Sequence, residues 1–133
     1  MTGLRCAAIL SCIVAMWLSK VDACKFEFRV RSKTNLPFQI QIYMLAIKKM
    51  SEKMQFTKKD VWRYVKLEGN NCYSKPIVIK TWSYNAVIRG WVPAKEMKAF
   101  VDGNGYVELF VEDNLVPSFR GRNRFFCSFG SCW

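Results

Sequence analysis

The sequence predicts an all-β domain, an antiparallel β-sandwich of about seven short strands with at most one short helix. Several segments alternate polar and apolar residues, which is the period of a strand with one buried face. Gly, Asn and Pro signals separate these segments, as in sandwiches of short strands. The 110 residues that follow a predicted 23-residue leader are the usual size of one domain. A small β-barrel is the alternative architecture.

The first two predicted strands have the clearest alternation. Residues 25–31, KFEFRVR, place three apolar side chains on one face and four charged side chains on the other. Residues 38–44, FQIQIYM, repeat the alternation after a break at residues 35–37. Two alternating runs joined by a turn favour antiparallel pairing.

The middle of the sequence is less regular. Residues 48–59, KKMSEKMQFTKK, are strongly charged, and we expect a loop there rather than a short helix. Residues 60–69, DVWRYVKLEG, fit either a helix or a strand, and their β-branched and aromatic content favours a strand. Residues 76–82 form the next predicted strand, with Pro76 at its first position. A further short strand is expected at residues 86–92.

Proline, glycine and asparagine signals shape the last third of the sequence. Residues 93–99, PAKEMKA, have proline where a helix commonly begins and good helix formers after it, which predicts one or two helical turns. Residues 102–105, DGNG, predict a turn because Asn and Gly tolerate positive φ. Alternation returns at residues 106–112, and residues 124–129 form the last predicted strand.

Residues 1–23 have the features of a secretory signal peptide. Arg5 supplies a positive start, residues 7–18 are an apolar run, and residues 21–23 offer a small-residue cleavage site. A membrane anchor is the alternative, but a 12-residue helical run spans only about 18 Å of a hydrocarbon core about 30 Å thick. We therefore expect a secreted protein whose mature part, residues 24–133, is one domain without a transmembrane span.

Cleavage of the leader would remove Cys6 and Cys12 and leave an even number of cysteines. In an oxidising compartment these are expected to form two disulfides, with three possible connectivities that the sequence does not distinguish. A four-thiolate zinc site would need two close cysteine pairs, whereas the chain has one, with the spacing C-x4-C. The four cysteines are Cys24, Cys72, Cys127 and Cys132.

The predicted mature domain is strongly basic. Removal of Arg5, Lys20 and Asp22 with the leader leaves 19 basic and nine acidic residues, a formal charge of +10. Such a charge attracts polyanions and discourages self-association, so a monomer is expected. Outside the cell, the candidate partners are an anionic glycan, a lipid head group or an acidic protein surface, and nucleic acid is not expected. Solubility alone is the competing explanation of the charge.

The residue types needed for common catalytic mechanisms are missing. The chain has no histidine, which excludes Ser-His-Asp and Cys-His triads. With the mature cysteines paired, no thiolate nucleophile remains, and the scattered acids form no recognisable pair for glycoside hydrolysis. Asp102 and Asn104 match the start of a calcium-binding loop, but Tyr106 stands where the next oxygen ligand belongs. No catalytic residue, metal site or cofactor is predicted, and the protein is expected not to be an enzyme.

Two groups of basic residues are the candidate binding sites. In the first, three arginines occupy every second position near the C-terminus and would point the same way, about 7 Å apart. This spacing suits a row of sulfates, phosphates or carboxylates, although a charged edge that prevents aggregation is the alternative. The second group lies in the predicted loop 48–59, where ordinary solvated lysines are the alternative. The candidates are Arg120, Arg122 and Arg124, followed by Lys48, Lys49, Lys58 and Lys59.

A family resemblance is carried by five segments, which are CKFEFRV, PFQIQIYM, KPIVIKTW, GYVELFVEDNLVP and CSFGSC. With these segments the chain resembles the small secreted β-rich proteins that are numerous in nematodes. The resemblance covers nearly the whole mature chain and implies a secreted domain with two disulfides. It assigns no activity and no functional residue.

These observations predict a secreted, non-enzymatic binding protein whose cationic surface meets an anionic extracellular molecule. A cationic host-defence effector acting on anionic membranes is one alternative, because Phe and Trp accompany the charge. A secreted ligand for a protein receptor is another, and would need a large exposed apolar patch. Burial of the aromatic residues near the C-terminus would argue against membrane insertion. These residues are Phe125, Phe126, Phe129 and Trp133.

Overall fold

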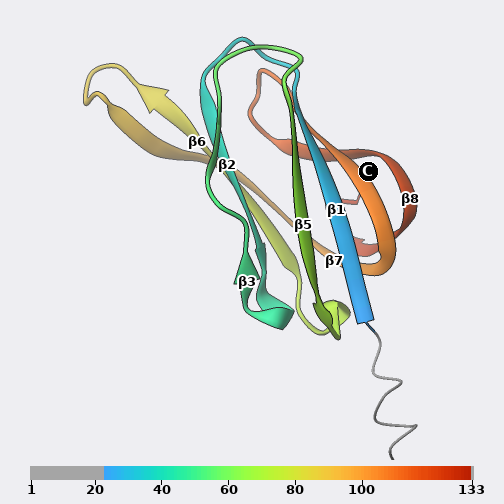
Figure 1. Ribbon diagram of the computed structural model, residues 1–133. Helices are drawn as coiled ribbons and strands as arrows, with labels where there is room; N and C mark the ends of the chain where they lie inside the picture. The colour runs from blue at the N-terminus through green and yellow to red at the C-terminus, as the bar shows by residue number, and fades with distance from the viewer. Residues whose placement is uncertain (1–22, 133) are drawn as a thin grey trace, which may run out of the picture.

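The computed structural model describes residues 23–132, and this part of the chain is all β, as the sequence predicts (Figure 1). The predicted signal peptide, apart from Ala23, lies outside the described residues, as does Trp133. The strands are β1 Ala23–Ser32, β2 Phe38–Met44, β3 Lys49–Met50, β4 Met54–Phe56, β5 Trp62–Asn70, β6 Ile77–Asn85, β7 Gly90–Val111 and β8 Pro117–Gly130. Two short 3-10 helices, η1 Leu45–Ile47 and η2 Cys72–Ser74, join them.

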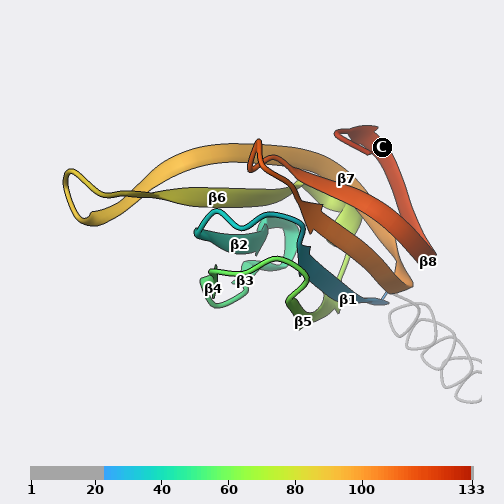
Figure 2. The ribbon, with the colours of Figure 1, turned by 90° about the horizontal axis from the view of Figure 1, so that it is seen from above.

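The eight strands form one mixed sheet that is nearly closed into a barrel-like shape (Figure 2). The strand order is β3-β2-β6-β7-β1-β5, with β4 also paired to β2 and β8 also paired to β7. Every pairing is antiparallel except that of β1 with β7, which runs parallel from Glu27↔Tyr106 to Ser32↔Val111. The all-β class is therefore confirmed, and the parallel pair is the one departure from an antiparallel sheet.

Strand β7 joins the two halves of this sheet. Its residues 90–99 pair with β6, its residues 99–111 pair with β8, and its residues 106–111 pair with β1 on the remaining edge. The β7–β8 ladder contains three register shifts, which bend a strand and increase its twist. The β2–β6 half of the sheet can therefore curl over the β1–β5 half.

The core lies inside the curled sheet. Alternation along β1 and β2 buries every second side chain, as the sequence predicts. Phe125 of β8 is surrounded by rings, with centroids 5.4 Å from Phe26, 5.2 Å from Phe119 and 6.3 Å from Phe28. The largest fully buried side chains are Phe26, Phe28, Phe38, Phe56, Phe125, Ile40, Ile42, Met44, Ile77, Ile79, Leu109 and Val30.

The helix expected at residues 93–99 is wrong, because these residues belong to β7. Met97, Ala99 and Val101 are buried at every second position, and Met97 lies opposite Ile79 of β6. Residues such as Ala, Lys, Glu and Met favour a helix locally, but that preference is worth only fractions of a kcal/mol per residue. Pairing with β6 and burial of alternate side chains outweigh it.

The turn expected at residues 102–105 is also wrong, because β7 continues through this segment without reversing its direction. Pairing is Gly103↔Phe125 and then Tyr106↔Asn123, so the segment is a bulge in the β7–β8 ladder. Gly103 has φ 125, and a Cβ there would collide with the carbonyl oxygen of Arg124. The glycines are needed for a close approach of β8 rather than for a chain reversal.

Four other expectations have mixed outcomes. The segments 60–69 and 76–82 are strands, as predicted, and correspond to β5 and β6. The expected loop 48–59 instead contains β3 and β4, because Met54 and Phe56 are buried and β4 pairs with β2. Residues 86–89 form a turn rather than part of a short strand.

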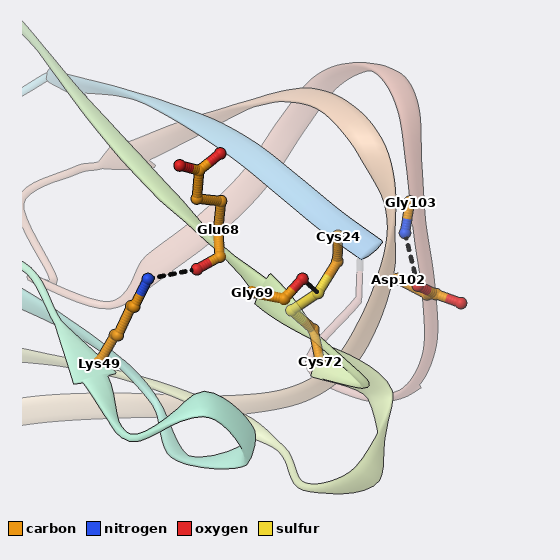
Figure 3. Close-up of a disulfide and its surroundings, with 7 residues drawn as sticks. All are labelled: Cys24, Lys49, Glu68, Gly69, Cys72, Asp102 and Gly103. Carbon is orange, nitrogen blue, oxygen red and sulfur yellow. Dashed lines mark hydrogen bonds between the residues drawn. A yellow bond between two sulfur atoms is a disulfide. The ribbon is translucent and has the colours of Figure 1, made fainter. Parts of the chain in front are cut away.

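Two disulfides are present, and they select one of the three possible connectivities. Cys24 at the start of β1 is bonded to Cys72 of η2 (Figure 3). Cys127 of β8 is bonded to Cys132, which closes a small ring at the end of the described chain. The first disulfide ties β1 to the segment between β5 and β6, and the second is local.

We predict that loss of the Cys24–Cys72 disulfide costs more stability than loss of the Cys127–Cys132 disulfide. The first closes a sequence separation of 48 residues and the second a separation of five. Chain entropy gives about 4 kcal/mol for the long loop and about 2 kcal/mol for the short one. Urea denaturation of the paired variants Cys24→Ser/Cys72→Ser and Cys127→Ser/Cys132→Ser measures both values, and the reverse order would contradict this account.

A second prediction separates two neighbouring phenylalanines of β8. Phe125→Ala should lower the free energy of unfolding by about 3 to 5 kcal/mol, since Phe125 is 2% exposed inside a cluster of rings. Phe126→Ala is the matched control, and it should change stability by less than about 0.5 kcal/mol because Phe126 is 66% exposed. Thermal or urea denaturation measures both variants, and similar losses would mean that β8 has a different register.

Candidate functional site

The three candidate arginines lie on β8, but they do not form a regular row. Arg120 Nη2 lies 3.2 Å from Glu112 Oε1 and is already engaged in an ion pair. Arg124 has φ 52, and register shifts with β7 occur on both sides of Arg122. The two-residue alternation that would align the three side chains is therefore interrupted, and their role in binding stays a prediction.

The candidate lysines lie at two ends of the sheet. Lys48 and Lys49 follow η1, whereas Lys58 and Lys59 lie in the loop between β4 and β5. The seven residues of β2 separate these two groups by about 20 Å, because β3 pairs with its end and β4 with its start. Lys49 Nζ donates a 2.7 Å hydrogen bond to the backbone oxygen of Glu68, across the gap between the β3 and β5 edges (Figure 3).

A projecting β-hairpin is the most distinctive surface feature. Strand β2 covers β6 only as far as the pair Phe38↔Ser83, whereas β6 and β7 continue to pair as far as Asn85↔Gly90. The end of the hairpin therefore extends beyond the rest of the sheet, as both views of the ribbon show (Figures 1 and 2). We call residues 84–91 the hairpin tip.

The hairpin tip exposes two consecutive aliphatic side chains. Val87 is 92% exposed and Ile88 is 61% exposed. The Asn85 side-chain oxygen accepts hydrogen bonds from the backbone N–H groups of Val87 at 2.9 Å and Ile88 at 3.3 Å. The turn thus presents apolar side chains while two of its backbone donors are satisfied internally.

Aromatic and basic residues follow behind the aliphatic pair. Tyr84 and Trp91 are cross-strand partners with their ring centroids 5.4 Å apart in an edge-to-face arrangement. They lie three residues from Val87 and Ile88, next to the pair Asn85↔Gly90 that closes the turn. Between Ile77 and Ala99 the hairpin carries four basic residues and one acidic residue, with Arg89 in the turn itself.

A second surface lies on the outer side of β1 and its neighbours. The Arg29 guanidinium carbon is 3.7 Å from the centroid of the Tyr106 ring, and the Arg31 guanidinium carbon is 5.0 Å from that of Trp62. Alternation places these cations outward while the phenylalanines of β1 point into the core. We call this surface the cation–ring face. Its members are Arg29, Arg31, Lys33, Trp62, Tyr106 and Phe110.

Two carboxylates fix these cations. Glu27 accepts a 2.8 Å hydrogen bond from Arg29 Nε, which raises the pKa of Arg29 above its ordinary value. Asp60 accepts a 2.9 Å hydrogen bond from Arg31 Nη2 and lies 3.5 Å from Lys33 Nζ. The bond from Arg31, followed by the charge of Lys33, lowers the pKa of the Asp60 carboxyl below its usual 3.8.

The aromatic residues near the C-terminus are only partly buried. Phe125 belongs to the core, but Phe126 and Phe129 are 66% and 67% exposed. Trp133 lies outside the described residues. The burial that would argue against membrane insertion is therefore not found for these two rings.

The hairpin tip was not predicted from the sequence, because residues 86–92 were expected to form a strand. A signal was present, since Asn85 and Gly90 bracket the four residues AVIR, and Asn and Gly commonly bound turns. The apolar character of Val87 and Ile88 concealed it, because turns are more often polar. The rings that stack on Arg29 and Arg31 come from other strands, and only the strand pairing brings them together.

Within residues 23–132, no helix is both long and apolar enough to cross a membrane. The same residues contain no cluster of three or more Cys, Asp or Glu side chains arranged to hold a metal ion.

No protein-family model matches the chain, and no curated protein sequence matches it. Two solved structures have a distant likeness to the chain. The crystal structure of the human-specific toxin intermedilysin has a TM-score of 0.33 and 8% identity, over 72% of this chain and 22% of that one. The crystal structure of a Gram-negative toxin has a TM-score of 0.33 and 14% identity, over 73% of this chain and 22% of that one. The chain thus matches less than a quarter of the length of each toxin.

The Asp60 carboxylate should make stability depend on pH in acid. Because its pKa is lower in the folded protein than in the unfolded chain, its contribution is complete above the unfolded value near 3.8 and is lost as pH falls through the folded value. Asp60→Asn should remove this contribution, and Asn suits the left-handed φ of 64 at this position. Urea denaturation should show a stability difference between the two proteins near pH 6 that shrinks in strong acid. A constant difference would contradict the assignment.

Proposed function

We propose that this protein is secreted and attaches reversibly to anionic membrane surfaces through the hairpin tip. The observation that carries the proposal is the exposure of Val87 and Ile88 at the end of a projecting hairpin, with Tyr84 and Trp91 behind them. Exposed apolar side chains at one projecting point are typical of a surface that enters another apolar phase.

The energetics of the tip support shallow insertion. Removing a Val or Ile side chain from water contributes about 1.5 to 3 kcal/mol each. An unpaired backbone N–H would cost several kcal/mol in the hydrocarbon layer, but Asn85 already accepts the N–H groups of Val87 and Ile88. The tip can therefore enter the membrane without exposing those two donors to lipid.

The rings behind the tip match the interface between hydrocarbon and water. Trp and Tyr are enriched at this level because each has an apolar body and a polar end. Tyr84 and Trp91 form the cross-strand pair next to the base of the turn, directly behind the aliphatic pair. An interfacial segment buries its apolar face to about 5 to 10 Å. Insertion of Val87 and Ile88 would thus bring the two rings to the head-group layer.

The basic residues of the hairpin would give the protein its preference for anionic lipids. Arg89 lies in the turn, and Lys80, Lys95 and Lys98 accompany it on the same hairpin with Glu96 as the one acid. A basic residue near an anionic surface contributes about 1 kcal/mol. Together with two small apolar side chains this gives weak, reversible attachment rather than permanent insertion.

The proposal also includes an extracellular location and a role without catalysis. The two disulfides are consistent with an extracellular protein, and the predicted signal peptide would direct it there. We include no enzymatic step, because the chain lacks histidine and Cys24, Cys72, Cys127 and Cys132 are paired in disulfides.

The exposed C-terminal rings are a second candidate for membrane contact, and the hairpin tip is favoured over them. Phe126 lies opposite Asp102 in the β7–β8 ladder, so an acid stands beside its ring. The ring centroids of Phe129 and Phe100 are 6.5 Å apart, and this contact covers part of the Phe129 ring. No acidic residue occurs between Ile77 and Lys95.

The test is binding to vesicles by co-sedimentation. The wild-type protein should bind phosphatidylcholine–phosphatidylserine vesicles more tightly than pure phosphatidylcholine vesicles, and salt should weaken the difference. Val87→Ser/Ile88→Ser removes about 3 kcal/mol of apolar transfer and should lower the partition coefficient roughly a hundredfold.

The matched control is Leu36→Ser/Leu45→Ser, which removes two exposed aliphatic side chains elsewhere and should leave vesicle binding unchanged. Phe126→Ala/Phe129→Ala tests the C-terminal rings. The assignment to the hairpin tip is wrong if this last variant loses binding while Val87→Ser/Ile88→Ser retains it. Membrane attachment itself is wrong if wild-type protein does not sediment with anionic vesicles at low ionic strength.

A further inference from the structure

We propose that a basic hollow between β1 and β7 binds a sulfate or phosphate ester group of a polyanionic ligand, independently of the hairpin tip. The hollow has a volume of about 270 Å³ and is open to solvent on one side. Lys25, Glu27 and Arg29 of β1, Lys66 of β5, and Gly105 and Tyr106 of β7 line it.

The hollow exists because two strands separate. Parallel pairing of β1 with β7 begins at Glu27↔Tyr106, and no pairing joins the earlier residues of β1 to β7. Just before Tyr106, β7 bulges towards β8, where a Cβ at Gly105 would collide with the carbonyl oxygen of Asn123. The glycine lets β7 follow β8 and leaves space beside the start of β1.

Three cations surround this space, and two of them are unengaged. Within the described residues, neither the Lys25 nor the Lys66 ammonium has an ion pair or hydrogen bond. Lys66 lies opposite Glu27 in the β1–β5 ladder, but the carboxylate of Glu27 is bonded to Arg29 instead. The lining therefore has three positive charges and one negative charge, and two of the positive charges are free to meet a ligand.

The third cation is held in a fixed position. The Arg29 guanidinium lies 3.7 Å above the centre of the Tyr106 ring and donates through Nε to Glu27 at 2.8 Å. An arginine that is already ordered loses little side-chain entropy when a ligand binds, and its remaining N–H donors match the geometry of an oxyanion. The ordered guanidinium of Arg29 would therefore orient the bound anion, whereas Lys25 and Lys66 would add positive charge.

The size and openness of the hollow indicate the class of ligand. A volume of about 270 Å³ is below the range of pockets that enclose drug-sized molecules, so it suits one anionic group and its attached ring. The open side would let a longer chain continue along β1, where Arg31 is the next outward cation. A sulfated or phosphorylated polymer meets these conditions.

The position of the hollow favours a ligand that is not the membrane contacted by the hairpin tip. The start of β1 and the tip of the β6–β7 hairpin lie at opposite sides of the molecule in both ribbon views (Figures 1 and 2). The hollow is lined mainly by charged and polar groups, with the half-buried ring of Tyr106 and the buried ring of Phe26. It therefore offers no exposed apolar side chain that could insert into a membrane.

The experiment is calorimetric titration with a heparin-derived tetrasaccharide at low ionic strength. Lys25→Gln/Lys66→Gln should weaken binding about tenfold, because two exposed charges are lost. Glu27→Gln removes the one acid in the hollow and keeps an oxygen acceptor for Arg29, so it should strengthen binding severalfold. If the thermal unfolding midpoint of this variant is unchanged, a gain of affinity cannot result from unfolding, which makes it the sharper of the two.

The matched control is Lys58→Gln/Lys59→Gln, which removes the same charge at the other end of the sheet and should leave affinity within about twofold. The proposal is overturned if this control loses as much affinity as Lys25→Gln/Lys66→Gln, or if Glu27→Gln gains none. It is also overturned if Arg120→Gln/Arg124→Gln abolishes binding while the hollow variants retain it.

A parallel titration with phosphoinositide-containing vesicles distinguishes the source of the anionic group. We expect the hollow variants to change tetrasaccharide affinity and to leave vesicle affinity unchanged. A change confined to vesicles would assign the group to a lipid head group and refute the polymeric ligand. Loss of vesicle binding in Val87→Ser/Ile88→Ser with unaltered tetrasaccharide affinity would support two independent sites.

Discussion

The long bent strand β7 is the constraint on which both candidate surfaces depend. Its first residues pair with β6 and extend past β2 to form the hairpin tip, and its last residues insert between β8 and β1. The bend between these parts relies on Gly103 and Gly105, where any side chain would meet the β8 backbone. Pairing of β7 with β1 begins only after these glycines, at Glu27↔Tyr106, and the hollow lies beside this point.

The outward face of β1 shows how a basic sheet keeps its charge without losing order. Each arginine lies against an aromatic ring from a neighbouring strand, with Arg29 on Tyr106 and Arg31 between Trp62 and Phe110. Such contacts hold the guanidinium groups against the rings. They also cover part of Arg31, whose Nε is buried without a hydrogen-bond partner. The few acids nearby orient these cations and do not neutralise the face.

Local patterns predicted much of the fold, and they were wrong where pairing between distant segments decides the structure. Alternation identified β1 and β2 because each buries one face against the core. Residues 93–99 were expected to be helical because helix propensity is a local property. In the structure, pairing of Met97 with Ile79 of β6 places this segment in a strand. DGNG was expected to form a turn because glycine permits a chain reversal. Glycine also permits the close approach of a neighbouring strand, as it does here for β8, and the sequence does not distinguish the two roles.

The candidate sites show the same difference between features that a local sequence pattern predicts and features that depend on the pairing of distant strands. The predicted disulfides were found because cysteine count and compartment determine them, but their pairing needed the fold. The arginines near the C-terminus looked aligned because an ideal strand has a period of two, and bulges against β7 remove that alignment. Lys25 and Lys66 lie 41 positions apart in the sequence and meet at one hollow only because β1 and β5 are paired. A cluster of this kind has no sequence signature.

The separation of the hairpin tip from the hollow has a physical consequence for how the two surfaces work together. Charges on opposite sides of a domain lie more than a Debye length of about 8 Å apart, so filling the hollow with an anion would hardly change the attraction of Arg89 to a membrane. The two sites therefore need not compete. Weak binding at the hairpin tip or at the hollow would not by itself retain the protein on a surface. Where lipid and polyanion occur together, binding at one site raises the local concentration of ligand at the other, and the protein is retained.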